Sequence, residues 1–195
     1  MSTFIATEFA EPAIRPVFDR PADAESLKEA LRTLGGGVSV ITAGEGEERS
    51  GATVTSATAL SVEPPRMLVS LNRSSSTWPV VERFRHFAVN VIGVDHRSIA
   101  NRFAGIGGVR GPERYAGAEW TRLASGAPVL ENAVAALDCE VEEAIERHSH
   151  VIVIGKVLAI RLGQGQSLLY QNGRYHSICN GAGKSVERFC GDGVR

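Results

Sequence analysis

The sequence predicts a β-rich α+β domain whose strands close into a barrel. At least six short stretches have the character of β-strands, and only two or three stretches have a helical period. The 21 glycines and the 6% aromatic content indicate turns and close backbone approaches more than a large helical core. At ~150 residues per domain, the 195 residues make about one domain. We expect it at 23–178, between an irregular arm at 1–22 and a loose tail at 179–195.

Three short helices are predicted over 23–34, 77–84 and 95–103. Residues on one face of the first helix are apolar and recur at i, i+3, i+4 and i+7, namely Leu27, Ala30, Leu31 and Leu34. The second helix has Pro79 in its first turn, where a missing N–H costs nothing. Asp95 is a favourable N-cap for the third.

The strands are predicted by a period of two. They cover 38–42, 51–59, 67–71, 87–92, 137–141, 151–162 and a closing pair within 167–178 that turns at Asn172-Gly173. Asp138, Glu140 and Glu142 alternate with apolar residues, which predicts a solvent-exposed face. The stretch 151–162 is apolar on both faces. We therefore expect it to be covered by the barrel core on one side and by something else, such as a partner subunit, on the other.

Charge and hydropathy exclude several classes of protein. Lys+Arg number 21 and Asp+Glu 22, so the net charge of -1 leaves no basic surplus for nucleic acid. No apolar run approaches the ~20 residues of a membrane span, and the N-terminus lacks a signal-peptide pattern. The three cysteines, Cys139, Cys179 and Cys190, form no CxxC pair. We expect no cysteine zinc site and a reducing, cytoplasmic location.

Two glycine-rich segments lack the pattern of a phosphate loop. The segment 181–185 ends in Gly-Lys-Ser, but Ile178 stands where a P-loop needs its first glycine. The segment 105–117 has Arg110 where GxGxxG needs its third glycine, and no βαβ unit surrounds it. We expect it to be a mobile surface loop, and any nicotinamide cofactor to bind outside a Rossmann domain.

Hydroxyl side chains are concentrated in two segments. They make up six of twelve residues over 50–61 and five of eight over 70–77, where Asn72 and Arg73 accompany them. Hydroxyls, an amide and an arginine supply donors for a phosphate and for the polar edge of a heterocycle. Thr and Ser are also common in strands and turns for structural reasons, so both interpretations stay open.

The histidines and carboxylates form no recognisable catalytic constellation. His148 and His150 lie two apart in a predicted strand and hence on one face, but the sequence places no third ligand beside them, so no metal site is predicted. A single histidine at the start of a strand, either structural or in contact with a ligand, is the favoured interpretation. Neither GxSxG nor HExxH occurs.

Seven segments follow one another in an order that carries a family resemblance. They are 31–42, 51–65, 87–91, 126–131, 136–141, 150–157, and 168–170 with 173–175. The most telling is 51–65, which opens with Gly-Ala-Thr and ends in Ser-Val-Glu-Pro-Pro. In this order the chain resembles the short-chain flavin reductases, which are NAD(P)H:flavin oxidoreductase components of two-component monooxygenases.

The resemblance implies a homodimeric Greek-key split β-barrel of the FMN-binding kind. A flavin, FMN or FAD, would lie in a groove near the subunit interface, with NADH or NADPH as co-substrate. Reduced flavin would pass to the oxygenase component of a flavin-dependent monooxygenase. The residues implied in flavin binding are Thr53, Val54, Thr55, Ser56, Leu71, Asn72, Ser75, Ser76, Thr77, Ala88, Val89, Asn90, Arg102 and Phe103.

The resemblance also places His150 beside the nicotinamide. Where the family often has Gly-Asp before this histidine, the chain has His148-Ser149, so a candidate orienting carboxylate is missing. Two alternatives remain open at this point. One is a flavin oxidase on the same fold with tightly bound FMN, and the other is a non-catalytic module that binds flavin or haem.

Overall fold

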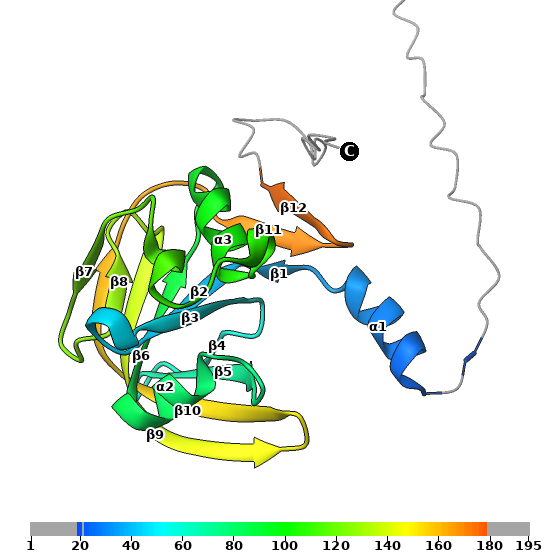
Figure 1. Cartoon of the computed structure of the whole chain (residues 1–195). Coiled ribbons are helices and arrows are strands. Elements are labelled where there is room, and N and C mark those ends of the chain that lie inside the picture. The colour runs from blue at the N-terminus through cyan, green and yellow to red at the C-terminus, as the bar shows by residue number, and fades with distance from the viewer. Residues whose placement is uncertain (1–18, 21, 179–195) are drawn as a thin grey trace, which may run out of the picture.

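A seven-stranded antiparallel sheet forms the centre of the molecule in the computed structural model, which describes residues 19, 20 and 22–178 (Figure 1). The strands run in the order β3-β2-β6-β9-β10-β5-β4. Their bounds are β2 Ser39–Ala43, β3 Ser50–Val54, β4 Thr58–Ser61, β5 Arg66–Asn72, β6 His86–Val91, β9 Ala135–Arg147 and β10 His150–Leu162. The predicted β-rich α+β class is confirmed.

The first and last strands of the sheet are neighbours in sequence. Only residues 55–57 separate β3 from β4, so the chain links the two ends of the sheet. The Ser56 hydroxyl donates to the Ser70 carbonyl of β5 at 2.8 Å. The stretch predicted as one strand over 51–59 is therefore two strands, because the chain leaves one edge of the sheet and joins the other.

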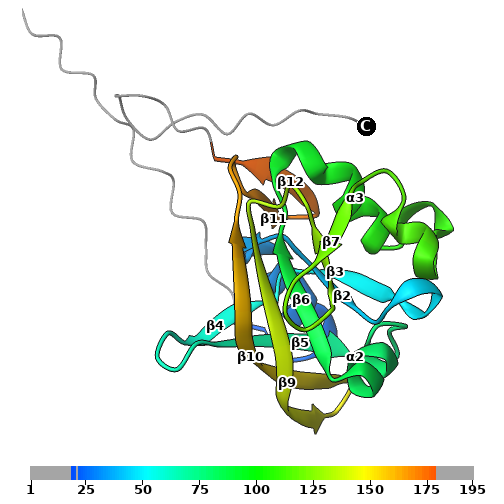
Figure 2. The same ribbon diagram turned by 90° about the vertical axis from the view of Figure 1, so that its left-hand side faces the viewer.

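The β9–β10 hairpin is the longest pair, with 13 residues in each strand (Figure 2). Its register shifts at Ile154/Gly155 and again between Val157 and Ala159, and such bulges bend a strand. A Cβ at Gly155 would lie 2.5 Å from the Phe87 ring, so the bend needs a glycine where β10 crosses the core.

Two smaller sheets complete the strands. One consists of β1 Gly36–Gly37, β11 Leu168–Gln171 and β12 Arg174–Ser177, and the other of β7 Trp120–Arg122 and β8 Pro128–Leu130. Asn172 and Gly173 have φ values of 50° and 76°, as a tight hairpin turn requires. The predicted closing hairpin is confirmed.

The helices are α1 Ala24–Thr33, α2 Trp78–Phe84 and α3 Arg97–Phe103, with 3-10 turns η1 Gly46–Glu48, η2 Val94–His96, η3 Ile106–Gly108 and η4 Gly111–Tyr115. Asp23 caps α1 by accepting from the Ser26 N–H at 2.8 Å. The predicted cap of α3 is wrong. Asp95 lies within η2, and His96 occupies the cap position without a side-chain bond.

The glycine-rich segment 105–117 is more ordered than a plain surface loop. It contains η3 and η4, and Tyr115 is buried. The Tyr115 ring lies 5.0 Å from that of Phe103 and 4.8 Å from that of Trp120, both edge to face. Burial of this aromatic cluster outweighs the local glycine content, so the sequence expectation is corrected here.

Two apolar clusters pack against the sheet. Ala88 of β6 belongs to one, with Ile99 and Phe103, while Val89 belongs to the other, with Leu71 and Val151. Adjacent residues of β6 therefore point into different clusters, and this strand is covered on both faces.

The exposed face predicted for β9 is only partly present. Glu140 and Glu142 are exposed, but Asp138 is fully buried. Its carboxylate accepts from the Ser125 N–H at 2.6 Å and from the Ser125 hydroxyl. The connection between β7 and β8 therefore covers this part of β9 and supplies the donors that a buried carboxylate needs.

Two apolar surfaces are left open in the described chain. Leu158, Ile160 and Leu162 of β10 are 39%, 57% and 81% exposed, so the outer side expected to be covered is open here. Leu27 and Leu31 are also exposed, and α1 buries no residue.

No helix within the described residues has the length and apolar character needed to cross a membrane. The segments 1–18 and 179–195, with the Gly-Lys-Ser motif, Cys179 and Cys190, lie outside the described residues.

Candidate functional site

The end of β5 and the start of β10 bring two predicted site segments together. His150 pairs with Asn72, and Val151 pairs with Leu71. Leu71 is buried, whereas Asn72 and His150 are exposed. The sheet therefore places the histidine next to the loop 72–77, which contains most of the second hydroxyl segment.

The loop 72–77 is shaped by its own side chains. Asn72 Oδ1 accepts from the Ser74 N–H at 2.9 Å and from its hydroxyl at 2.8 Å. The Trp78 N–H donates to Ser75 Oγ at 3.3 Å, at the start of α2. These local bonds use the side chains of Asn72 and Ser75 and fix the course of the loop.

The two hydroxyl segments meet at Ser50. Its Oγ lies 3.3 Å from Ser76 Oγ and 3.5 Å from Thr77 Oγ1. Ser50 and Thr77 are buried, while Ser76 is exposed. Ser50 was not among the predicted site residues, although its place in the first hydroxyl segment is a signal that could have indicated it.

Along β3, the implied flavin contacts differ in availability. The Thr53 hydroxyl donates to the Ala100 carbonyl of α3 at 2.6 Å, and that of Ser56 is bonded to Ser70. Val54 is half-buried and Thr55 is exposed. Thr55 is thus the residue of this group whose hydroxyl faces solvent and can meet a ligand directly.

The β6 residues lie behind the site. Ala88, Val89 and Asn90 are at most 1% exposed. The Asn90 amide donates to the Val40 carbonyl and to Thr42 Oγ1, each at 3.0 Å, and accepts from the Leu130 N–H at 2.8 Å. Their side chains therefore do not line a surface of this chain. The Asn90 amide joins three strands, so any contact of these three residues with a flavin would come from the β6 backbone.

Arginine side chains gather beside β3. Arg102 Nη2 donates to the Glu113 carbonyl at 2.7 Å, and the Arg49 guanidinium lies 4.4 Å from the Tyr115 ring centroid. The Nε atoms of both arginines are buried and have no hydrogen-bond partner among the described residues. Buried donors are nearly always paired, so these two atoms are exceptions among the described residues. Phe103 is buried and packs against the Tyr115 ring in the aromatic cluster.

The two histidines of the hairpin differ in conformation. His148 has a φ of 50° and lies in the turn, so the predicted placement of both on one strand face is wrong. His150 begins β10, with Nδ1 2.9 Å from Ser149 Oγ. No group of three or more His, Cys, Asp or Glu in the described part of the chain is arranged to hold a metal ion.

Burial also decides which groups are chemically inactive. It raises the pKa of the Cys139 thiol to about 12, with the Asp138 charge adding to the effect. A thiol with such a pKa is protonated at neutral pH and is a poor nucleophile.

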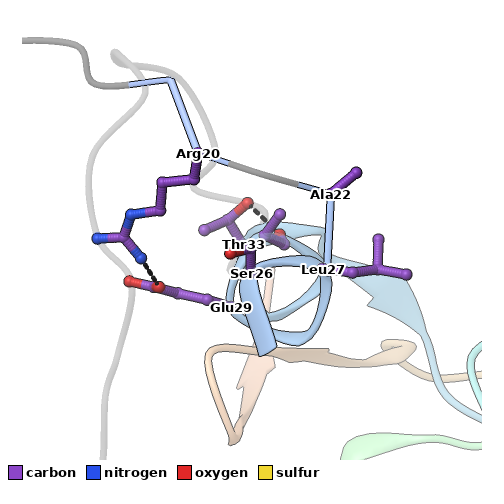
Figure 3. A pocket seen from close by; sticks show the side chains of 7 residues that line it. Arg20, Ala22, Ser26, Leu27, Glu29 and Thr33 are labelled. Atoms are coloured by element: carbon purple, nitrogen blue, oxygen red, sulfur yellow. Dashed lines mark hydrogen bonds and ion pairs between the residues drawn. The ribbon is translucent and has the colours of Figure 1, made fainter. Parts of the chain in front are cut away.

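A shallow pocket on α1 is separate from this group of residues. It is lined by Arg20, Ala22, Ser26, Leu27, Glu29, Ala30 and Thr33 (Figure 3). Arg20 and Glu29 form an ion pair across it, so its charges are already paired. None of its lining residues is a predicted site residue.

In the described part of the chain, the candidate site combines hydroxyl-rich segments with an exposed histidine and two buried arginine Nε donors. Residues 31–179 match the family model described as Flavin reductase like domain. The chain belongs to this family, and the resemblance found in its seven segments is confirmed.

Two known relatives are similar over most of the chain. FMN reductase (NADH) RutF of Variovorax paradoxus is 37% identical over 154 residues, which cover 77% of this chain and 83% of that protein. Actinorhodin polyketide dimerase of Streptomyces coelicolor is 35% identical over 164 residues, which cover 83% of this chain and 90% of that protein.

Two solved structures have a similar fold. NADH:FAD oxidoreductase SgcE6 of Streptomyces globisporus, in complex with NAD and FAD fragments, has a TM-score of 0.76 and 26% identity over 86% of this chain and 100% of that chain. BorF, the flavin reductase component of a bacterial two-component tryptophan halogenase, has a TM-score of 0.73 and 26% identity. The match covers 80% of this chain and 98% of that chain.

Proposed function

We propose that this protein is an NADH-dependent flavin reductase that transfers hydride from the nicotinamide to FMN or FAD. The observation that carries the proposal is the β5–β10 register, which sets His150 beside the hydroxyl loop 72–77 in a chain of the flavin reductase family. The relative from Variovorax paradoxus is named for FMN and NADH, and the Streptomyces globisporus structure holds NAD and FAD fragments.

The site fits a phosphorylated flavin. Thr55 and Ser76 are exposed hydroxyl residues, and Ser76 also contacts Ser50. We assign these residues, with the backbone of 53–56 and 72–77, to holding the flavin, and His150 to contacting the nicotinamide. Flavin itself supplies the hydride acceptor. In this chemistry the protein binds the two ring systems, aligns them and keeps water away, and hydride transfer requires no acid–base group of the protein.

The reduced flavin serves a partner oxygenase in this proposal. BorF is by its description the reductase component of a two-component halogenase, and it shares the fold of this chain. No contact with the oxygenase is required, because a diffusing reduced flavin is enough. The reducing compartment suggested by the cysteine usage supports a cytoplasmic location.

We further assign the chain a homodimeric split barrel. The support is the exposed apolar row Leu158, Ile160 and Leu162 on β10, together with the short link 55–57 that joins the two end strands of the sheet. A contiguous exposed apolar face is typical of a protein interface. Light scattering of the whole chain should give twice the mass of one subunit, and Ile160→Glu should shift it toward one. A monomeric wild-type protein would contradict this part.

The activity is tested by a two-by-two turnover assay. Purified chain is mixed with NADH or NADPH and with FMN or FAD, and loss of reduced nicotinamide is followed by absorbance. Loss that requires flavin and is fastest with NADH supports the proposal. No flavin-dependent loss in any of the four mixtures contradicts it, and flavin binding without turnover would then indicate a non-catalytic binding module. A protein that stays yellow after dialysis and consumes no NADH would indicate an oxidase with bound FMN.

A further inference from the structure

One arginine ties the turn before His150 to the hydroxyl loop. The Arg73 N–H donates to the Ser149 carbonyl at 2.9 Å, and its Nη1 donates to the His148 carbonyl at 3.3 Å. Its Nη2 lies 2.8 Å from Glu146 Oε2. The end of β9 and the 148–149 turn are therefore bonded to the residue that directly follows Asn72.

A second contact acts on the imidazole itself. Ser149 Oγ lies 2.9 Å from His150 Nδ1, and His150 is exposed at the first position of β10. An exposed histidine without such a bond samples several rotamers and both neutral tautomers. A hydrogen bond at Nδ1 restricts the ring rotation, favours one tautomer and leaves Nε2 available to a ligand.

We propose that Arg73 and Ser149 are positioning residues for His150. Arg73 holds the hairpin at a fixed place beside the loop 72–77, and Ser149 holds the ring in one orientation. Both act before the co-substrate arrives, so less conformational freedom is lost when it binds. The inference rests on the proposed function, in which His150 contacts the nicotinamide.

The Ser149 contact is tested without any turnover. Long-range 1H–15N spectra of the whole chain, recorded where the ring is neutral and assigned with His150→Gln, give the tautomer ratio of His150. A typical hydrogen bond shifts such an equilibrium roughly 2- to 10-fold, so Ser149→Ala should change the ratio by that factor. Ser149→Thr keeps a hydroxyl and should restore it. An unchanged ratio in Ser149→Ala would overturn the role of Ser149.

The Arg73 contact is tested by steady-state kinetics. Arg73→Ala should raise KM for NADH about 5-fold or more while kcat changes less than twofold, because two of the three contacts that Arg73 makes with the hairpin are lost. Arg73→Lys keeps a positive charge for Glu146, so its KM for NADH should lie between those of the wild type and Arg73→Ala. The matched control is Arg147→Ala, since Arg147 donates only to the neighbouring Glu146 carbonyl among the contacts described. Equal effects of Arg73→Ala and Arg147→Ala on KM would overturn the role of Arg73.

Failure of the proposed function looks different from failure of this inference. Wild-type protein that consumes no NADH with either flavin contradicts the proposed function, and the tautomer ratio still measures the Ser149 contact. Active wild-type protein, with an unchanged tautomer ratio in Ser149→Ala and an unchanged KM in Arg73→Ala, overturns the inference and leaves the function in place.

Discussion

The two hydroxyl-rich segments of this protein have similar compositions and different tasks. In 50–61, the hydroxyls of Thr53 and Ser56 donate to carbonyls of distant elements, α3 and β5. In 70–77, the bonds of Ser74 and Ser75 stay within the loop and the start of α2. These bonds of the first segment therefore connect it to α3 and β5. Those of the second segment shape a loop in which Ser76 is exposed and also contacts Ser50. The number of hydroxyls indicates a capacity for hydrogen bonding, and only their partners show which are available to a ligand.

The largest expected loss of stability is at Asn90, in the framework behind the first hydroxyl segment. Asn90→Ala should lower the free energy of unfolding by about 2–4 kcal/mol, because it leaves the buried Leu130 N–H without an acceptor and opens a cavity. Chemical denaturation measures the loss. A stability change below about 0.5 kcal/mol, combined with weaker flavin binding, would mean that Asn90 contacts the ligand directly.

Gly51→Ala tests how closely the first segment is packed. A Cβ at Gly51 would lie 2.5 Å from the Ile41 carbonyl oxygen and 2.6 Å from the Phe103 ring. We expect a loss of about 1–3 kcal/mol in unfolding free energy, as for other overpacked cores. Gly37→Ala is the matched control, since nothing lies within 4 Å of its added Cβ. Similar melting temperatures for the two variants would contradict the close packing.

Ser76→Ala separates the two tasks. Removal of the exposed Ser76 hydroxyl should weaken flavin binding roughly tenfold, as expected for the loss of a hydrogen bond to a charged group. The free energy of unfolding of the Ser76→Ala protein should stay within about 0.5 kcal/mol of that of the wild type. Flavin titration and denaturation are run on the same preparation. If stability falls and flavin affinity does not, the loop is structural like the first segment.

Ser56→Ala should have the smallest effect among the variants designed to lower stability. The variant loses the hydrogen bond to Ser70 between the β3–β4 link and β5, which is worth about 0.5–1.5 kcal/mol. Ser56→Thr keeps the hydroxyl and serves as the control in the same denaturation experiment. A variant as stable as wild type would show that closure of the sheet does not depend on this bond.

Much of the fold could be predicted because its signals are local. The Asn172-Gly173 turn and the apolar runs of β6 and β10 depend on residues a few positions apart. The site was predictable to a lesser degree. The family resemblance indicated the loop 72–77 and His150, whereas Ser50 and Arg49 were missed because neither matches a motif.

The sequence by itself determined the β-rich class, the main helices and strands and the family, because periodicity and motif order are properties of the chain. Only the tertiary structure decided that Asp138 is buried, that Asn90 joins three strands and that His148 leaves the strand for the turn. It also brought Arg73 to the hairpin of His150. The physical reason is that burial and hydrogen bonding depend on partners far away in sequence, and their positions are fixed only when the sheet has formed.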